Sequence, residues 1–224
     1  MTEREQTQAA LCGRILDTAL TLAEERGSWE SLRLHDVADA LNIPLAEIHA
    51  CYAQQDDLAE AWFDRADRAA LRAREGSDFA DLPPAARLER VMLAWLVALQ
   101  PHRRLTRGML AYKLEPGHLH LQLPGLARVS RTVQWFREAA QQDSTGLRRI
   151  VEETALTLIY LRAFARWLYD DSPGACHTHD WLARALQRYA GCQAQAAVRS
   201  SATPDRRAGV PGTREGRAGS GAAD

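Results

Sequence analysis

The 224-residue chain lacks the short motifs that mark most common enzymes and nucleotide-binding proteins. It has no G-x-S-x-G, no P-loop and no G-x-G-x-x-G, so neither an activated serine nor a phosphate-binding glycine loop is encoded. No apolar run approaches the roughly 18 residues that a membrane span requires. The first ten residues, MTEREQTQAA, are polar and unlike a secretory signal. We therefore expect a cytoplasmic protein that is not an enzyme, with no catalytic residue, no cofactor and no membrane span.

Cysteine is scarce, and its spacing excludes the usual structural zinc motifs. The four cysteines are Cys12, Cys51, Cys176 and Cys192. None forms a C-x-x-C pair, and without an export signal we expect all four to be reduced thiols. Two short motifs, His118-x-His120 and Cys176-His177-x-His179, contain metal-ligand residue types. Residues two apart on a helix point to different faces, and no further ligand lies at a suitable spacing, so no metal site is expected.

Strand patterns are also lacking, whereas helical periodicity recurs along most of the chain. Within residues 115–125, the stretch HLHLQL alternates like a strand, but no second strand candidate exists to pair with it. The Pro-Gly boundaries of this segment predict an irregular loop instead. The other periodic segments carry apolar residues three or four apart, which is the spacing of helices packed on one side. We therefore predict an all-α protein.

Residues 31–58 have the layout of a helix-turn-helix. The first helix has one apolar face, formed by Val37, Ala38 and Leu41. Asn42 follows where the chain must turn sharply, and asparagine tolerates left-handed backbone. Pro44 suits the first turn of a second helix, where its missing N–H costs nothing. Ile48 and Tyr52, four apart, predict the buried stripe of that second helix.

The flanking segments extend this pattern into a domain. Upstream, residues 11–23 form an amphipathic helix that ends at Gly27, with Trp29 following as an apolar anchor. Downstream, Leu58 begins a long helix. With Asp36-Val37-Ala38, Asn42-Ile43-Pro44 and Ile48-His49-Ala50-Cys51-Tyr52 between them, residues 11–62 resemble the N-terminal domain of the TetR/AcrR family of bacterial regulators. The resemblance implies a homodimer that binds double-stranded operator DNA and is released by a small apolar ligand.

The positions at which that family contacts DNA hold unusual residues here. The candidate DNA-binding residues are Pro44, Leu45, Glu47, His49, Gln54 and Gln55. The hydroxyl residue, tyrosine and lysine that usually hold phosphates in the family are replaced by Pro44, His49 and Gln55. Residues 1–58 contain four arginines and eleven carboxylates, a formal charge of −7 that opposes attraction to phosphate. A three-helix domain retained without DNA contact therefore stays open as the alternative.

Residues 59–191 would form the helical ligand-binding and dimerisation domain that the resemblance implies. Large aromatic and methionine side chains fall on the helices expected to enclose its centre, where they would line an apolar ligand pocket. These candidates are Met92, Trp95, Met109, Tyr112, Trp135, Phe136, Tyr160 and Phe164. The same residues would equally fill a core without a void. Arg107 and Glu115 would orient a polar ligand group or simply lie at the surface.

The helix expected at residues 145–169 is apolar on most faces and must be buried on most faces. Pairing it and the last helix across a two-fold axis gives a four-helix dimer interface. The candidate interface residues are Leu158, Leu161, Ala165, Leu168, Trp181, Leu182 and Leu186. A monomer with a tight core is the alternative. Residues 192–224 are rich in Ala, Gly, Ser, Pro and Arg, and are expected to be a disordered tail.

Two functions therefore remain open. The first is a DNA-binding, ligand-released regulator with the TetR fold. The second is a lipid-binding accessory protein of ubiquinone biosynthesis, from a family that resembles TetR proteins in fold and is not known to bind DNA. Residues 171–186, DSPGACHTHDWLARAL, loosely resemble the closing region of that second family. The acidic N-terminal domain favours the second function, whereas the lack of a clear membrane-surface amphipathic helix disfavours it.

Overall fold

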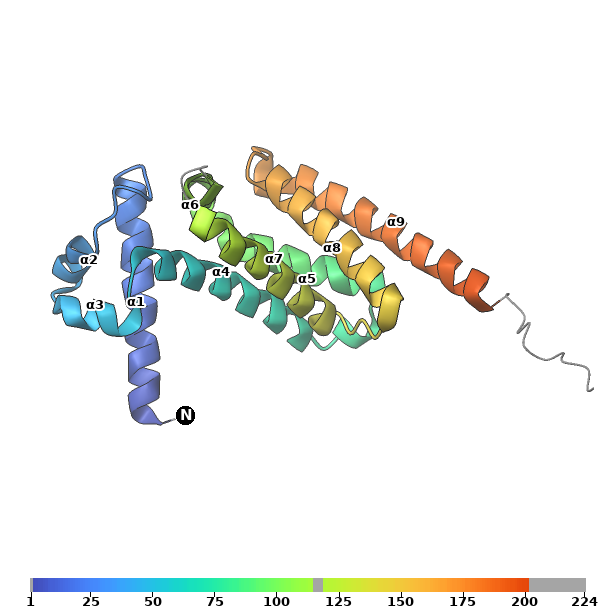
Figure 1. The fold of residues 1–224 in the computed structure, drawn as a ribbon, viewed down its shortest axis with the longest axis horizontal. Coiled ribbons are helices and arrows are strands. Elements are labelled where there is room, and N and C mark those ends of the chain that lie inside the picture. The colour runs from blue at the N-terminus through green and yellow to red at the C-terminus, as the bar shows by residue number, and fades with distance from the viewer. Residues whose placement is uncertain (1, 115–118, 202–224) are drawn as a thin grey trace, which may run out of the picture. The chain divides into compact units, whose positions relative to one another are not determined.

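All the regular secondary structure in the described part of the chain is helical. The computed structural model describes residues 2–114 and 119–201, and within these ranges there is no strand. The helices are α1 (Glu3–Glu25), α2 (Leu34–Leu41), α3 (Leu45–Cys51), α4 (Gln55–Arg72), α5 (Pro84–Leu99), α6 (Arg103–Leu114), α7 (Leu119–Ala139), α8 (Gly146–Trp167) and α9 (Cys176–Ser201). The predicted all-α class is confirmed. Figure 1 shows α2 and α3 beside α1, and α4 running from this group towards α5 and α7.

The predicted helix-turn-helix is formed by α2 and α3, with α1 packed behind them. Helix α2 ends at Asn42, whose φ of 52° is left-handed, and Pro44 has the extended backbone that starts α3. Val37 and Ile48 are fully buried in the same core as Ile15 of α1. The turn residues and the apolar spacing therefore produce the expected helix-turn-helix. Each of its two helices buries its apolar side chains and exposes its other faces to solvent.

The connection from α1 to α2 depends on Gly27 and Trp29. Gly27 has a φ of 72°, and no atom lies within 4 Å of where its Cβ would be. Backbone conformation, not space, therefore favours glycine at this end of α1. Trp29 is 2% exposed, and its carbonyl oxygen accepts a hydrogen bond of 2.7 Å from Nε2 of Gln55. This contact fixes the loop against the start of α4.

A disulfide joins α1 to α3, contrary to the expectation of four reduced thiols. Cys12 and Cys51 are bonded across a sequence separation of 39 residues, with their Cα atoms 5.4 Å apart. Cys176 and Cys192 are free and exposed. The expectation was wrong for the first pair because it relied on local spacing. Only the packing of α3 across α1 brings Cys12 and Cys51 together.

Helix α4 contacts both the helix-turn-helix domain and the helices that follow it. Arg65 donates from Nη1 to Oδ1 of Asp17 in α1 at 2.6 Å. Three residues earlier, Nε1 of Trp62 donates to Oγ1 of Thr106 in α6 at 2.9 Å, and both side chains are buried. A displacement of α4 would therefore also displace α1 and α6, because hydrogen bonds and a shared core connect all three helices.

Two helices are longer than the sequence predicted. Helix α7 begins at Leu119, so residues 119–125 are helical and their assignment to an irregular loop was wrong. A proline this near the helix start removes one backbone hydrogen bond, and Pro124 does not end the helix. Helix α9 continues to Ser201, past the predicted start of the tail at 192, because alanine and glutamine favour helix. Residues 115–118 and 202–224, including Glu115 and His118, lie outside the described residues.

Candidate functional site

The outer face of the helix-turn-helix is open to solvent. Leu45 is 52% exposed, and Pro44, Glu47 and His49 are exposed as well. On α3 only Ile48 is buried. A shallow groove with apolar walls runs between α2 and α3 and includes Leu45 and His49 in its lining. The helix is therefore presented as a recognition helix must be, but most of the surface it offers is apolar.

The start of α4 is occupied by a carboxylate. Backbone amides at a helix N-terminus normally attract anions. Here Oδ2 of Asp57 accepts from the backbone nitrogens of Ala53 at 3.0 Å and Gln54 at 3.2 Å. Gln55 is half-buried and uses its Nε2 to bind the Trp29 carbonyl. Of the two glutamines predicted to contact DNA, only Gln54 is exposed.

Two of the four arginines in this domain are engaged within the protein. Arg26 forms an ion pair with Asp36, and the hydrogen bond from Arg26 lowers the pKa of that carboxyl group. Arg33 donates from Nη1 to the carbonyl oxygens of Glu30 at 2.7 Å and Leu32 at 2.9 Å. These contacts orient positive charge towards the protein's own oxygens. Arg26 and Arg33 are therefore less available to phosphate than arginines without such contacts would be.

A cluster of aromatic rings occupies the centre of the remaining helices. The ring of Trp95 lies 4.9 Å from that of Phe164 and 5.3 Å from that of Tyr160, both nearly perpendicular to it. Phe136 is 5.4 Å from Tyr160. Burial raises the pKa of the Tyr160 hydroxyl well above its usual range. These predicted pocket residues are therefore brought together, and the rings of these three pairs pack edge to face against one another.

The other predicted pocket residues have different surroundings. Met92 and Met109 are buried in the same core. Trp135 is 44% exposed, so it points away from that core. The side chain of Tyr112 lies outside the described ones. Six of the eight candidates are thus buried together: Met92, Trp95, Met109, Phe136, Tyr160 and Phe164.

A buried polar network connects this aromatic cluster to α4. Oδ1 of Asp67 accepts from Nε1 of Trp95 at 2.8 Å and from Oγ1 of Thr132 at 3.1 Å. Its Oδ2 accepts from Nη2 of Arg128 at 2.9 Å. Arg128 also donates from Nη1 to Asp64 of α4 at 2.7 Å. The Asp67 carboxylate on α4 is therefore hydrogen-bonded directly to side chains of α5 and α7. Sequence reasoning missed this network because its members come from three distant segments.

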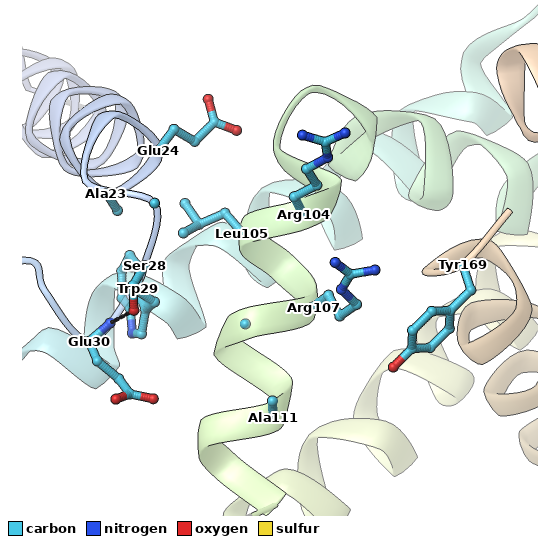
Figure 2. Close-up of a pocket in the computed structure, with 12 residues that line it drawn as sticks. Ala23, Glu24, Ser28, Trp29, Glu30, Arg104, Leu105, Arg107, Ala111 and Tyr169 are labelled. Atoms are coloured by element: carbon cyan, nitrogen blue, oxygen red, sulfur yellow. Dashed lines mark hydrogen bonds between the residues drawn. The ribbon is translucent and has the colours of Figure 1, made fainter. Parts of the chain in front are cut away.

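A cleft of about 690 Å³ with both polar and apolar walls lies between the end of α1 and α6. Figure 2 shows Arg104 and Arg107 of α6 on one side, and Glu24 and Glu30 on the other. The guanidinium of Arg107 is 5.3 Å from the centre of the Tyr169 ring. The remaining lining residues are Ala23, Gly27, Ser28, Trp29, Leu105, Gly108 and Ala111. Of these residues only Arg107 was predicted from the sequence to contact a ligand, because no local pattern shows that the others converge.

An apolar stripe runs along the exposed side of α8. Among the predicted interface residues, Leu158 is 64% exposed, Leu161 is 40% exposed and Ala165 is exposed. Residues Leu147, Ile150 and Val151 extend the stripe towards the start of the helix. Leu168 and Trp181 are half-buried. Leu182 and Leu186 are fully buried within the protomer, so they have no surface to offer a partner.

Solved structures with this fold are transcriptional regulators. A TetR transcriptional regulator from Nitrosomonas europaea ATCC 19718 is 42% identical and superposes with a TM-score of 0.72, covering 81% of this chain and 98% of its own. The chain belongs to the TetR family of transcriptional regulators. A TetR regulator from Rhodococcus sp. RHA1, 17% identical with a TM-score of 0.59, has the same fold over 83% of this chain and 96% of its own. No protein-family model and no curated protein matches the chain.

Membership of the TetR family confirms the resemblance that residues 11–62 indicated. The departures at the DNA-contact positions are therefore variations within the TetR family. Among the described residues, no helix is long and apolar enough to cross a membrane. In the same part of the chain, no group of three histidine, cysteine, aspartate or glutamate side chains is placed so that it could hold a metal ion.

Proposed function

We propose that this TetR-family regulator is a DNA-binding homodimer whose affinity for its operator is lowered by a small apolar ligand. The observation that carries the proposal is the exposed face of α3 beside an ordered turn. Leu45 and His49 point outwards while Ile48 holds the helix in place. A seven-residue helix exposed in this way has the size and accessibility of a recognition helix that enters the major groove.

Recognition would depend on base edges and shape more than on phosphate charge. Leu45 offers an apolar contact of the kind that thymine methyl groups accept. His49 and Gln54 are the exposed polar candidates for phosphate contacts. Two phosphate contacts in each protomer predict a salt slope of roughly −4 for the dimer, since each contact contributes about −0.9. A shallow slope is therefore the signature of this site.

The dimer would form through the exposed stripe of α8. Leu147, Ile150 and Leu158 are each more than half exposed. Large apolar side chains gathered on one face mark an interaction surface. A two-fold axis would place this stripe against its own copy and space the two recognition helices for adjacent turns of DNA. The stripe itself contributes no charge, so burying it is favourable.

The ligand response would pass through Asp67. A ligand inserted among the rings of Trp95, Tyr160 and Phe164 would displace Trp95, whose Nε1 bonds to Asp67 of α4. Helix α4 contacts the DNA-binding domain at two points: Gln55 donates to the Trp29 carbonyl, and Arg65 donates to Asp17 of α1. The ligand would thereby favour an arrangement of the two DNA-binding domains that no longer fits the duplex. The response requires the ligand to bind this arrangement more tightly than the DNA-bound one.

The test is DNA binding at low ionic strength, where the phosphate contribution is largest. Fluorescence anisotropy with a random duplex and with the DNA upstream of the gene should show binding that favours the upstream DNA. Leu45→Glu should abolish it, because the glutamate would replace the apolar contact with a negative charge inside the strongly negative major groove. Val97→Glu on α5 is a matched control, since Val97 is 56% exposed and lies outside the helix-turn-helix. Absence of any binding at low salt would refute the proposal.

A lipid-binding protein without DNA contact is the second candidate. The carboxylate of Asp57 at the start of α4 and the formal charge of −7 in residues 1–58 favour it. The solved structures named above give it no support, because both are transcriptional regulators. The same experiment separates the two: no duplex binding at low salt, together with binding of an isoprenoid lipid in vesicles, would establish the second function.

A further inference from the structure

The recognition helix has few anchors besides the disulfide. Helix α3 contains seven residues, and Ile48 is the one fully buried among them. The hydroxyl of Tyr52, just after the helix, donates to the Cys12 carbonyl at 3.0 Å. A helix of this length is unstable alone and depends on tertiary contacts. The bond between Cys12 and Cys51 attaches its last residue covalently to α1.

The two bonded cysteines lie near the surface of the domain. Cys12 and Cys51 are half-buried, so neither is sealed in the core. Nε2 of Gln8 lies 3.2 Å from Sγ of Cys51 and 3.9 Å from Sγ of Cys12. Their Cα separation of 5.4 Å is in the range that a disulfide needs. The backbone therefore allows the bond to form and to break without moving α1 away from α3.

We propose that Cys12 and Cys51 form a thiol–disulfide switch that fixes the recognition helix α3 to α1 when oxidised and loosens it when reduced. The effect of this switch on DNA affinity rests on the proposed function. The structure shows the oxidised state; small thiols would open the bond to two thiols, and an oxidant would close it again.

A peroxide is the chemical class of oxidant that completes the reaction. One thiolate attacks a peroxide oxygen, which breaks the O–O bond and leaves a sulfenic acid and, after protonation, one water. The second thiol then attacks that sulfur, forming the S–S bond and releasing a second water. The two sulfur atoms lose two electrons, and hydrogen peroxide is reduced to two waters. Two small thiols reverse the reaction by exchange and leave as their own disulfide.

The oxidised form is the one that should bind DNA more tightly. A cross-link over 39 residues restricts the unfolded chain and holds α3 in the orientation seen here. A recognition helix already held in its bound orientation loses less conformational freedom on binding. We expect the oxidised protein to bind the upstream duplex about tenfold more tightly than the reduced protein, a ratio equivalent to about 1.4 kcal/mol.

The experiment compares the full chain after treatment with hydrogen peroxide and after treatment with dithiothreitol. Alkylation of the denatured protein followed by intact mass should show two modified cysteines in the oxidised sample and four in the reduced one. Tm should be roughly 10 °C higher when oxidised. Hydrogen exchange in peptides covering residues 45–52 should be slower. Equal alkylation, Tm and exchange in the two samples would overturn the switch.

Matched serine variants identify the pair. Cys12→Ser should abolish the oxidant's effect on Tm and exchange, whereas Cys176→Ser, at a free and exposed cysteine, should preserve it. If Cys12→Ser does not fold, the comparison of oxidised and reduced wild type still decides the question. An unchanged duplex affinity beside a changed exchange rate would overturn the switch as a regulator. Absence of duplex binding in both states, with the exchange difference intact, would refute the proposed function alone.

Discussion

Removing the carboxylate of Asp67 should destabilise the protein more than removing any exposed carboxylate nearby. Asp67 is 7% exposed and accepts hydrogen bonds from Trp95, Thr132 and Arg128. Asp67→Ala leaves an indole N–H and a hydroxyl without their partner, and deprives the buried Arg128 of one carboxylate. Breaking a buried ion pair from one side typically costs 3–5 kcal/mol. Because Asp64 still pairs with Arg128, we expect the lower end, about 3 kcal/mol.

Thermal and urea unfolding provide the measurement. A loss of about 3 kcal/mol should lower Tm by roughly 6–12 °C in a protein of this size. Asp64→Ala is the matched control, since its side chain is 47% exposed and exposed pairs contribute about 1 kcal/mol or less. Asp67→Asn should fall between them, because its amide oxygen still accepts from Trp95.

A double substitution separates pairing from packing. Asp67→Leu with Arg128→Met removes both charges, and replacing a buried pair by apolar side chains is often neutral or stabilising. The double variant should therefore be more stable than Asp67→Ala alone, and a double-mutant cycle gives the coupling energy. If Asp67→Ala costs no more than Asp64→Ala, then the network does not connect α4 to α5 and α7 energetically, and the route suggested for the ligand response is wrong.

Three further outcomes follow from the structure. Leu158→Glu should convert the dimer to a monomer in sedimentation velocity, because it places a charge in the apolar stripe of α8; a dimer unaffected by it would exclude that stripe. His49→Lys should strengthen duplex binding and steepen the salt slope by about 0.9 for each new phosphate contact, and an unchanged slope would mean that α3 does not reach the backbone. Although burial by itself raises it, hydrogen bonds from Ser172 and Thr178 lower the pKa of Asp170 below its usual value. This carboxylate therefore stabilises the fold above its unfolded pKa of about 3.9, and the stabilisation is lost as pH falls through the folded pKa. Asp170→Asn should reduce stability at pH 7 by about 1–3 kcal/mol and lower Tm accordingly. The gap from wild type should begin to narrow below about pH 4 and keep narrowing as pH falls towards the folded pKa; a gap independent of pH would contradict this.

The helix-turn-helix was predictable because its signals are local. Asn42 adopts the left-handed backbone expected of it, and Gly27 ends α1 as its position indicated. The apolar spacing of Val37 and Ile48 identified the buried faces. Each of these features depends on the chemistry of a few adjacent residues, so the sequence alone was sufficient. The acidity of residues 1–58 is likewise a property of composition alone.

The features that distinguish this regulator depend on packing between distant segments. Sequence periodicity marked Leu182 and Leu186 as apolar, but only the neighbouring helices decided that they face the protomer core while Leu158 faces solvent.

The sequence by itself determined the class of fold, the helix-turn-helix and its unfavourable charge for DNA. The tertiary structure alone decided the disulfide between Cys12 and Cys51 and the buried contact of Asp67 with Arg128. The physical reason is the range of the interaction. Helix periodicity and turn conformation are encoded within a few residues, whereas a covalent or ionic contact between helices exists only after the chain has brought distant segments within a few ångströms of each other.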